Sequence, residues 1–252
     1  MNAPIPRPVP AAPAAADERC SACGSHPFCL SAGLDSLAGL RFDTLLGQRR
    51  RVARGTFLYR TGQPLRSLHA VRCGYFKTVR PGPAGEQVTG FQMTGELLGM
   101  EAIGSGIHQC DAVALEDSVV CDMPFAALEQ MFDEVPGLHR RFCRLMSREL
   151  NREQDQMLLL GNMRAEQRLA VFLVDIGARY AARGYSATQF QLRMSREDIG
   201  SYLGLTIESI SRLLARFTKL GLITVDKRAI VLRDPARLAA MADGGAPCNP
   251  LA

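Results

Sequence analysis

The spacing of hydrophobic and polar residues changes character near the middle of the chain. Between residues 47 and 124, short apolar runs alternate with turn residues such as glycine and proline. This texture is typical of short antiparallel strands, and the connections are too short for the crossover helices that parallel strands need. We therefore predict a β-roll, in which the alternation over 68–80 forms a strand and PGPAGE (81–86) forms a turn.

A helical pattern replaces the strand pattern after Pro136. Residues 137–163 contain no proline and are rich in good helix formers. Five positions there alternate spacings of four and three, as in the seam of a coiled coil: Met146, Leu150, Glu153, Met157 and Leu160. We predict a long dimerisation helix over 136–163, followed by a second helix from Ala165 to Arg183.

Glu153 is an unusual residue for a seam position. Two copies of the helix would bring two Glu153 carboxylates together, and like charges in a poorly solvated contact destabilise it. Such a dimer is marginal, so a modest input can shift its population. The alternative is that Glu153 lies at a solvated edge and that the seam is a plain hydrophobic contact.

The most specific local pattern lies in MSREDIGSYLGLTIESISRLLARFTKLGLI (194–223). Ser195 and Asp198 form a capping box that opens a short helix. Gly204 ends this helix, and Thr206 caps a second one. The apolar face of the second helix consists of Ile210, Leu213, Leu214 and Phe217. Two short helices joined by a glycine turn predict a helix-turn-helix.

The opposite face of the second helix carries side chains suited to DNA. Glu208, Ser211 and Arg212 project together because they lie three and four positions apart, and these residue types can bond to base edges. The predicted DNA-binding residues are Glu208, Ser209, Ser211, Arg212, Arg216 and Lys219, of which the last two suit phosphates. A hairpin wing is expected at 223–232. The alternative is a solvated helix of an ordinary helical domain, which the order of cap, glycine turn and wing disfavours.

Composition narrows the class of protein. The 252 residues are 47% hydrophobic, which suffices for two folded domains, and the net charge of +5 does not by itself indicate a nucleic-acid partner. There is no run of eighteen apolar residues, so we expect no membrane span. The proline-rich residues 1–18 predict a disordered arm rather than a signal peptide, and 241–252 a flexible tail. We expect a cytoplasmic protein, where a reducing environment disfavours disulfides.

CSACGSHPFC (20–29) gathers three cysteines and a histidine within ten positions. Iron–sulfur clusters use thiolates, often several closely spaced in sequence and one distant. Zinc also accepts thiolates, and His26 would complete a Cys3His set with Cys20, Cys23 and Cys29. The spacing alone does not decide between a zinc site and an iron–sulfur cluster.

The chain holds eight cysteines, and those beyond this stretch have ordinary explanations. Cys73 and Cys143 are expected to be small buried hydrophobic residues of a strand and a helix. Cys110 is expected in a loop or at the start of a strand, and Cys248 in the tail.

A β-roll, a long helix and a winged helix-turn-helix, in this order, resemble the cyclic-AMP receptor protein superfamily of bacterial transcription regulators. Within it, the chain resembles the fumarate and nitrate reduction regulator group. The matching stretches are C-x2-C-x5-C from Cys20, TGFQMTGELLGMEAIGSG (89–106), LEDSVVCDMPF (115–125) and GLTIESISRLLARF (204–217). The resemblance implies an α+β fold with a cyclic-nucleotide-binding-like sensor domain at 19–135, the dimerisation helix at 136–163 and a winged helix-turn-helix domain at 164–240.

The resemblance also implies a cofactor. Its ligands would be Cys20, Cys23, Cys29 and Cys121, which hold an oxygen-labile [4Fe–4S] cluster. Cys110 is the nearest rival of Cys121 as the fourth ligand. A zinc-stabilised or thiol-redox-sensing regulator of the same superfamily is the alternative.

The partners implied by the resemblance are a second copy of the chain, a palindromic DNA promoter site and RNA polymerase. The turn at 81–86 matches a polymerase-contacting loop of the family in position. This turn carries Gly85 where an acidic residue is frequent in the family. Activation through this loop is therefore in question, and repression at some promoters is an alternative.

Two further classes are disfavoured. The cyclic-AMP receptor protein holds its nucleotide with a Gly-Glu-Leu turn and an Arg-Ser pair. Gly95, Glu96 and Leu97 keep the turn, but Cys110-Asp111 stands where the pair is expected, and a carboxylate there repels phosphate. We therefore expect no cyclic nucleotide. The sequence also has no phosphate-binding loop, dinucleotide fingerprint or HExxH pair, so we expect no enzyme.

Overall fold

The computed structural model describes residues 20, 23, 26–46, 49–82 and 85–242. The predicted disordered arm, Cys248 and nearly all of the predicted tail therefore lie outside the described residues. The chain divides into two compact units, one ending at Arg152 and the other beginning at Glu153. The long helix α3 (Pro136–Asn162) is shared between them.

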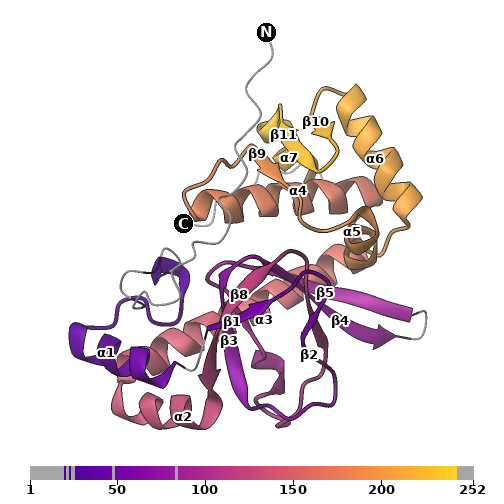
Figure 1. The fold of residues 1–252 in the computed structure, drawn as a ribbon. Coiled ribbons are helices and arrows are strands. Elements are labelled where there is room, and N and C mark those ends of the chain that lie inside the picture. The colour runs from indigo at the N-terminus through magenta and orange to yellow at the C-terminus, as the bar shows by residue number, and fades with distance from the viewer. Residues whose placement is uncertain (1–19, 21–22, 24–25, 47–48, 83–84, 243–252) are drawn as a thin grey trace. The chain divides into compact units, whose positions relative to one another are not determined.

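The first unit contains a roll of two antiparallel four-stranded sheets (Figure 1). One sheet has the order β1 (Arg49–Val52), β8 (Ser118–Pro124), β3 (Ser67–Cys73) and β6 (Leu97–Leu98). The other has the order β2 (Phe57–Tyr59), β7 (Asp111–Ala114), β4 (Tyr75–Gly82) and β5 (Gly85–Met93). Buried residues of both sheets form one hydrophobic cluster, so the predicted β-roll is confirmed.

The prediction of one continuous strand over 68–80 is wrong. The chain breaks at Gly74, whose φ of 100° is a conformation that residues with side chains rarely adopt. A Cβ at this position would also lie only 2.1 Å from Ser118 Oγ. Because of this break, β3 ends at Cys73 and β4 begins at Tyr75 in the other sheet.

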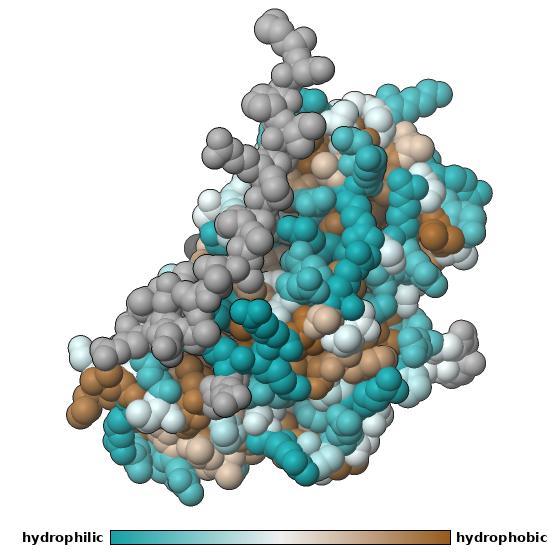
Figure 2. All heavy atoms as spheres, viewed as in Figure 1, coloured by the Kyte–Doolittle hydropathy of each residue, from teal (hydrophilic) through white to brown (hydrophobic). Residues whose placement is uncertain are grey.

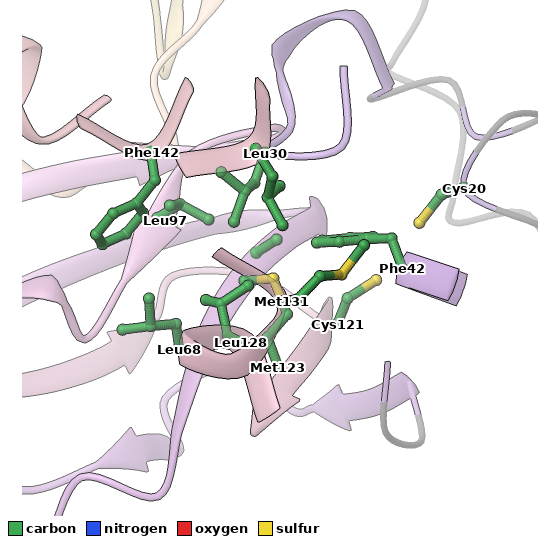
Figure 3. Packing of buried hydrophobic residues seen from close by; sticks show 12 residues of the cluster. Cys20, Leu30, Phe42, Leu68, Leu97, Cys121, Met123, Leu128, Met131 and Phe142 are labelled. Atoms are coloured by element: carbon green, nitrogen blue, oxygen red, sulfur yellow. The ribbon is translucent and has the colours of Figure 1, made fainter. Parts of the chain in front are cut away.

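A second hydrophobic cluster lies between the roll and three helices (Figure 3). The helices are α1 (Ser36–Leu45), α2 (Phe125–Glu134) and the first turns of α3. The buried residues of this cluster are Cys20, Leu30, Phe42, Leu68, Ala70, Leu97, Cys121, Met123, Leu128, Met131, Leu138 and Phe142. Two of the predicted ligand cysteines therefore belong to a hydrophobic core.

The second unit is a winged helix-turn-helix. Its helices are α4 (Ala165–Ala182), α5 (Arg196–Leu203), α6 (Ile207–Lys219) and α7 (Pro235–Ala242). Its sheet has the order β10 (Ile223–Asp226), β11 (Ala229–Leu232) and β9 (Gln189–Gln191). The predicted hairpin wing is β10 and β11. Sequence reasoning missed β9, because three residues are too few for an alternation to be visible.

Local sequence rules account for the two helices of the motif. The Ser195 N–H donates to Asp198 Oδ2 at 2.8 Å, and the Asp198 N–H donates to Ser195 Oγ at 3.0 Å. Gly204 ends α5 with a φ of 63°, and Thr206 Oγ1 accepts from the Ser209 N–H at 3.2 Å. The predicted apolar positions of α6 are all buried: Ile210, Leu213, Leu214 and Phe217.

The predicted α+β fold class is confirmed by this order of roll, long helix and winged helix-turn-helix. Most of the face shown in Figure 2 is hydrophilic. Within the described part of the chain, no helix is both long and apolar enough to cross a membrane.

Candidate cysteine site and DNA-reading helix

Four cysteines line one small pocket in the first unit. Cys20, Cys23 and Cys29 come from the N-terminal stretch 20–31, here called the cysteine segment, and Cys121 comes from β8. The sulfur atoms of Cys20 and Cys121 point toward one another beside the ring of Phe42 (Figure 3). The structure thus brings Cys121 together with three cysteines from which most of a β-roll separates it in the sequence. Their role as ligands stays a prediction.

Backbone contacts fix both sides of this pocket. The Cys20 N–H donates to Asp43 Oδ1 of α1 at 2.8 Å. Cys121 pairs with Arg49 of β1 on one side and with Ala70 of β3 on the other. Cys121 therefore belongs to an inner strand of the sheet, where its position is constrained by two neighbours.

Burial favours the protonated form of three of these thiols, those of Cys20, Cys29 and Cys121. Removal from water raises the pKa of Cys121 to about 11, with the nearby Cys29 adding to the rise and Arg49 opposing it. The pKa of Cys20 is raised by burial and by its hydrogen bond to Asp43, and that of Cys29 chiefly by burial. Thiolates at this site consequently require a compensating positive charge.

The donor set fits an iron–sulfur cluster by its chemistry. Among the described residues the pocket wall offers four thiols and neither a carboxylate nor an imidazole. The cavity between them measures about 10 Å³, room for at most one water molecule. A bound cluster would need part of this wall to lie further out. No three or more described His, Cys, Asp or Glu residues are arranged to hold a single metal ion, and the side chain of His26 lies outside the described ones.

The remaining described cysteines lie elsewhere. Cys110 is buried directly before β7, where its thiol contacts Tyr59 and Glu101, and it does not line the pocket. Cys73 is half-buried, whereas Cys143 is exposed on α3. The prediction that both cysteines are buried is therefore wrong, and Cys143 is exposed because it lies on a solvent-facing side of α3.

The cysteine segment covers the Gly95-Glu96-Leu97 turn. A Cβ at Gly95 would lie only 2.4 Å from Phe28 Cβ, so only a residue without a side chain permits this contact. The Glu96 carboxylate lies 3.8 Å from Nη1 of Arg152 in α3. This turn is therefore engaged by two other parts of the same chain.

The predicted reading residues lie on the solvent side of α6. Glu208 and Arg212 are exposed, while Ser209 and Ser211 are half-buried. Arg212 donates to Ser209 Oγ at 3.4 Å, and Arg196 of α5 donates to Ser211 Oγ at 3.1 Å. Backbone hydrogen bonding at the start of α6 lowers the pKa of Glu208, so this side chain is a carboxylate at neutral pH.

The two predicted phosphate contacts differ in their surroundings. Arg216 forms an ion pair with Glu166 of α4, whereas Lys219 is exposed in the last turn of α6. The wing turn holds Lys227 at a φ of 53°. Arg216 and Lys219 lie on the same helix as the predicted reading residues, and cations at such positions suit a polyanion.

α3 exposes a line of apolar side chains. Leu150 is 56% exposed and Met157 is 66% exposed, and the neighbouring Leu158 is 58% exposed. Glu153 is exposed between them, while Met146 and Leu160 are half-buried. Apolar side chains grouped in this way mark interaction surfaces. The dimer seam concerns a second copy of the chain and stays a prediction.

Sequence reasoning missed the residues that support these sites. Asp43 holds Cys20, Arg49 lies beside Cys121, and Arg196 holds Ser211. No local pattern marks such residues, because their partners come from distant parts of the chain.

Comparison with known proteins gives a consistent result. A model of the Crp-like helix-turn-helix domain matches residues 167–241, and a model of the cyclic nucleotide-binding domain matches residues 49–135. The chain is 43% identical to the transcriptional regulatory protein btr of Bordetella pertussis, over 90% of this chain and 94% of that protein. It is 41% identical to the fumarate and nitrate reduction regulatory protein of Salmonella typhimurium, over 88% and 90%. The structure of FixK2 from Bradyrhizobium japonicum superposes with a TM-score of 0.71 at 30% identity, covering 77% of this chain and 96% of that one.

The raised pKa of Cys121 predicts a specific alkylation profile in metal-free protein. Only the thiolate reacts, and a pKa of about 11 keeps it in the minority up to pH 10. The labelling rate with iodoacetamide should therefore rise about tenfold per pH unit from pH 8 to pH 10. Peptide mass spectrometry measures the rate, with free cysteine run alongside as the ordinary profile. A rate that levels off near pH 9 would contradict the burial of this thiol.

Proposed function

Because the chain belongs to the Crp/FNR family of transcription regulators, we propose that it is an oxygen-responsive DNA-binding regulator of the cytoplasm. Its cofactor is a [4Fe–4S] cluster held by Cys20, Cys23, Cys29 and Cys121. The observation that carries this proposal is the gathering of these four thiols at one pocket with neither a carboxylate nor an imidazole among its described wall residues.

When bound, such a cluster supplies a group that oxygen degrades, so that the state of the site depends on oxygen. The thiolates must come from both the cysteine segment and β8. Ligation therefore ties residues 20–29 to the strand that leads directly into α2 and α3. A change at the pocket is then passed to the helix that pairs two copies of the chain.

The homodimer forms along α3 through Met146, Leu150, Glu153, Met157 and Leu160. The exposed Leu150 and Met157 supply apolar area, and the two Glu153 carboxylates oppose pairing. Pairing places two α6 helices on one face of DNA, so a palindromic promoter site is recognised, with half-sites about one helical turn apart. RNA polymerase is the further partner.

The contacts of the Gly95 turn support the proposal that no cyclic nucleotide is sensed. Phe28 packs on Gly95, and Arg152 pairs with Glu96. A carboxylate, Asp111, opens β7 at the place where the resemblance expects a phosphate-binding pair. Side chains of the same chain therefore contact the turn where a nucleotide would otherwise bind.

A zinc site is the second candidate, and the cavity of about 10 Å³ favours it because a single ion needs little room. Anaerobic purification followed by iron, sulfide and zinc analysis separates the two. We expect about four irons and four sulfides per chain. One zinc without sulfide would overturn the oxygen-sensing proposal and support the alternative regulator.

Replacement of Glu153 tests the dimer seam. Glu153→Ala removes two like charges from the proposed contact, so the dimer should form in air at least about tenfold more tightly than that of the wild type. Sedimentation equilibrium measures the dissociation constant. Asp155→Ala, which removes an exposed carboxylate off the seam, should leave it unchanged. A Glu153→Ala protein that stays monomeric would contradict both the proposed dimer contact along α3 and the role of Glu153 in switching.

Replacements on α6 test the reading set. Arg212→Ala should weaken specific binding by about 1–3 kcal/mol and relax discrimination at one base pair. Lys219→Ala should weaken binding to all sequences evenly and lower the salt slope by about one. Fluorescence anisotropy on specific and scrambled duplexes at several salt concentrations reports both quantities. Equal losses on both duplexes for Arg212→Ala would show that this residue contacts only phosphate.

A further inference from the structure

Arg141 of α3 connects the cysteine segment to the long helix. Its Nε donates to the carbonyl oxygen of Cys29 at 3.1 Å, and its Nη2 donates to the carbonyl oxygen of Pro27 at 3.1 Å. These hydrogen bonds join residues more than one hundred positions apart in sequence. They are charge-assisted, since the guanidinium stays protonated in proteins.

The two acceptors flank a proposed ligand. Cys29 supplies both the sulfur at the pocket and the carbonyl that Arg141 binds. The same carbonyl accepts from the Ala32 N–H at 3.1 Å, so the guanidinium and the next turn of backbone share one atom of the segment. A displacement of Cys29 therefore changes the environment of Arg141 directly.

The segment forms part of the pocket wall. The cavity beside the four thiols is about 10 Å³, so a group larger than a water molecule bound there would displace part of that wall. Phe28 holds the other side of the segment against Gly95. α3 contacts both sides of Gly95 through Arg152, which donates to the Phe91 carbonyl of β5 at 2.9 Å and lies 3.8 Å from the Glu96 carboxylate.

We propose that Arg141 is a positioning residue that transmits the state of the cysteine pocket to the dimerisation helix. This inference rests on the proposed function. Arg141 anchors the segment on the first turns of α3 through these two hydrogen bonds. The anchor is present without a cluster, so a shift of the segment on ligation of its thiols is passed to the helix. The fork of donors on one rigid guanidinium makes the helix follow the segment in orientation as well as in distance.

Arg148 provides a matched control. It lies on the same helix two turns further along, is exposed, and contributes to the same cluster of positive charge as Arg141. Arg148→Ala removes the same charge and leaves the hydrogen bonds to Pro27 and Cys29 in place.

The experiment compares full-length wild type, R141A and R148A, each purified anaerobically and each also in cluster-free form. Iron and sulfide analysis measures occupancy, and sedimentation equilibrium gives the ratio of dimerisation constants with and without the cluster. R141A should keep wild-type iron and sulfide while this ratio falls by at least about fivefold, the lower end of ordinary coupling between sites. R148A should keep the ratio within about twofold.

Hydrogen exchange gives a readout that does not depend on the cluster. In cluster-free R141A, the amides of Ala32 and Leu34 should exchange faster than in R148A, because the segment has lost its anchor on α3. Exchange as slow as in the control would overturn the positioning role whatever metal the protein holds. R141K, which keeps the charge without the fork, should recover only part of the dimerisation ratio.

The remaining outcomes separate the two proposals. An unchanged ratio in R141A, with wild type responding to the cluster, overturns the role of Arg141 alone. Loss of iron and sulfide in R141A also overturns it, because Arg141 would then build the pocket rather than report on it. A wild-type protein that assembles no cluster, or dimerises equally with and without it, overturns the proposed function, and the exchange result still decides whether Arg141 positions the segment.

Discussion

The pairing of β8 with strands on both of its sides governs the arrangement of the cysteine site. Cys121 lies opposite Arg49 of β1 and Ala70 of β3, so its backbone has little freedom. The cysteine segment must reach this fixed point from outside the roll, and it does so by packing Cys20 and Leu30 into the core that α1, α2 and α3 share. A cysteine on an inner strand and residues of the cysteine segment are thus combined within a single hydrophobic cluster.

Burial gives this arrangement its chemical character. The core excludes water from the thiols and raises the pKa of Cys20, Cys29 and Cys121. Deprotonated sulfurs are unfavourable there unless positive charge is close. Arg49 and Arg72 lie near Cys121 and lower the pKa of its thiol, but by less than burial raises it. The site therefore favours either neutral thiols or thiolates bound to a cation, and the free thiolate is the least stable form.

The parts of the fold that follow local rules could be predicted from the sequence. The Ser195 capping box, the Gly204 helix end and the buried face of α6 depend on residues a few positions apart. The break at Gly74 could not, because a single glycine within an alternating pattern does not reveal its positive φ or its close contact with Ser118 of another strand. The exposure of Cys143 was missed because a helical repeat does not say which side faces the roll. Arg141 carries no sequence signal either, since its acceptors are backbone carbonyls that any residues could provide.

The contact of Phe28 with Gly95 has a consequence for competition at the roll. Phe28 belongs to the same chain as the turn it covers, so it acts as a tethered ligand whose effective concentration is in the millimolar range for short flexible connections. Any free molecule that approaches Gly95 must displace this side chain first. Binding of a free molecule at this turn is therefore coupled to displacement of Phe28, and the free energy of that contact lowers its apparent affinity.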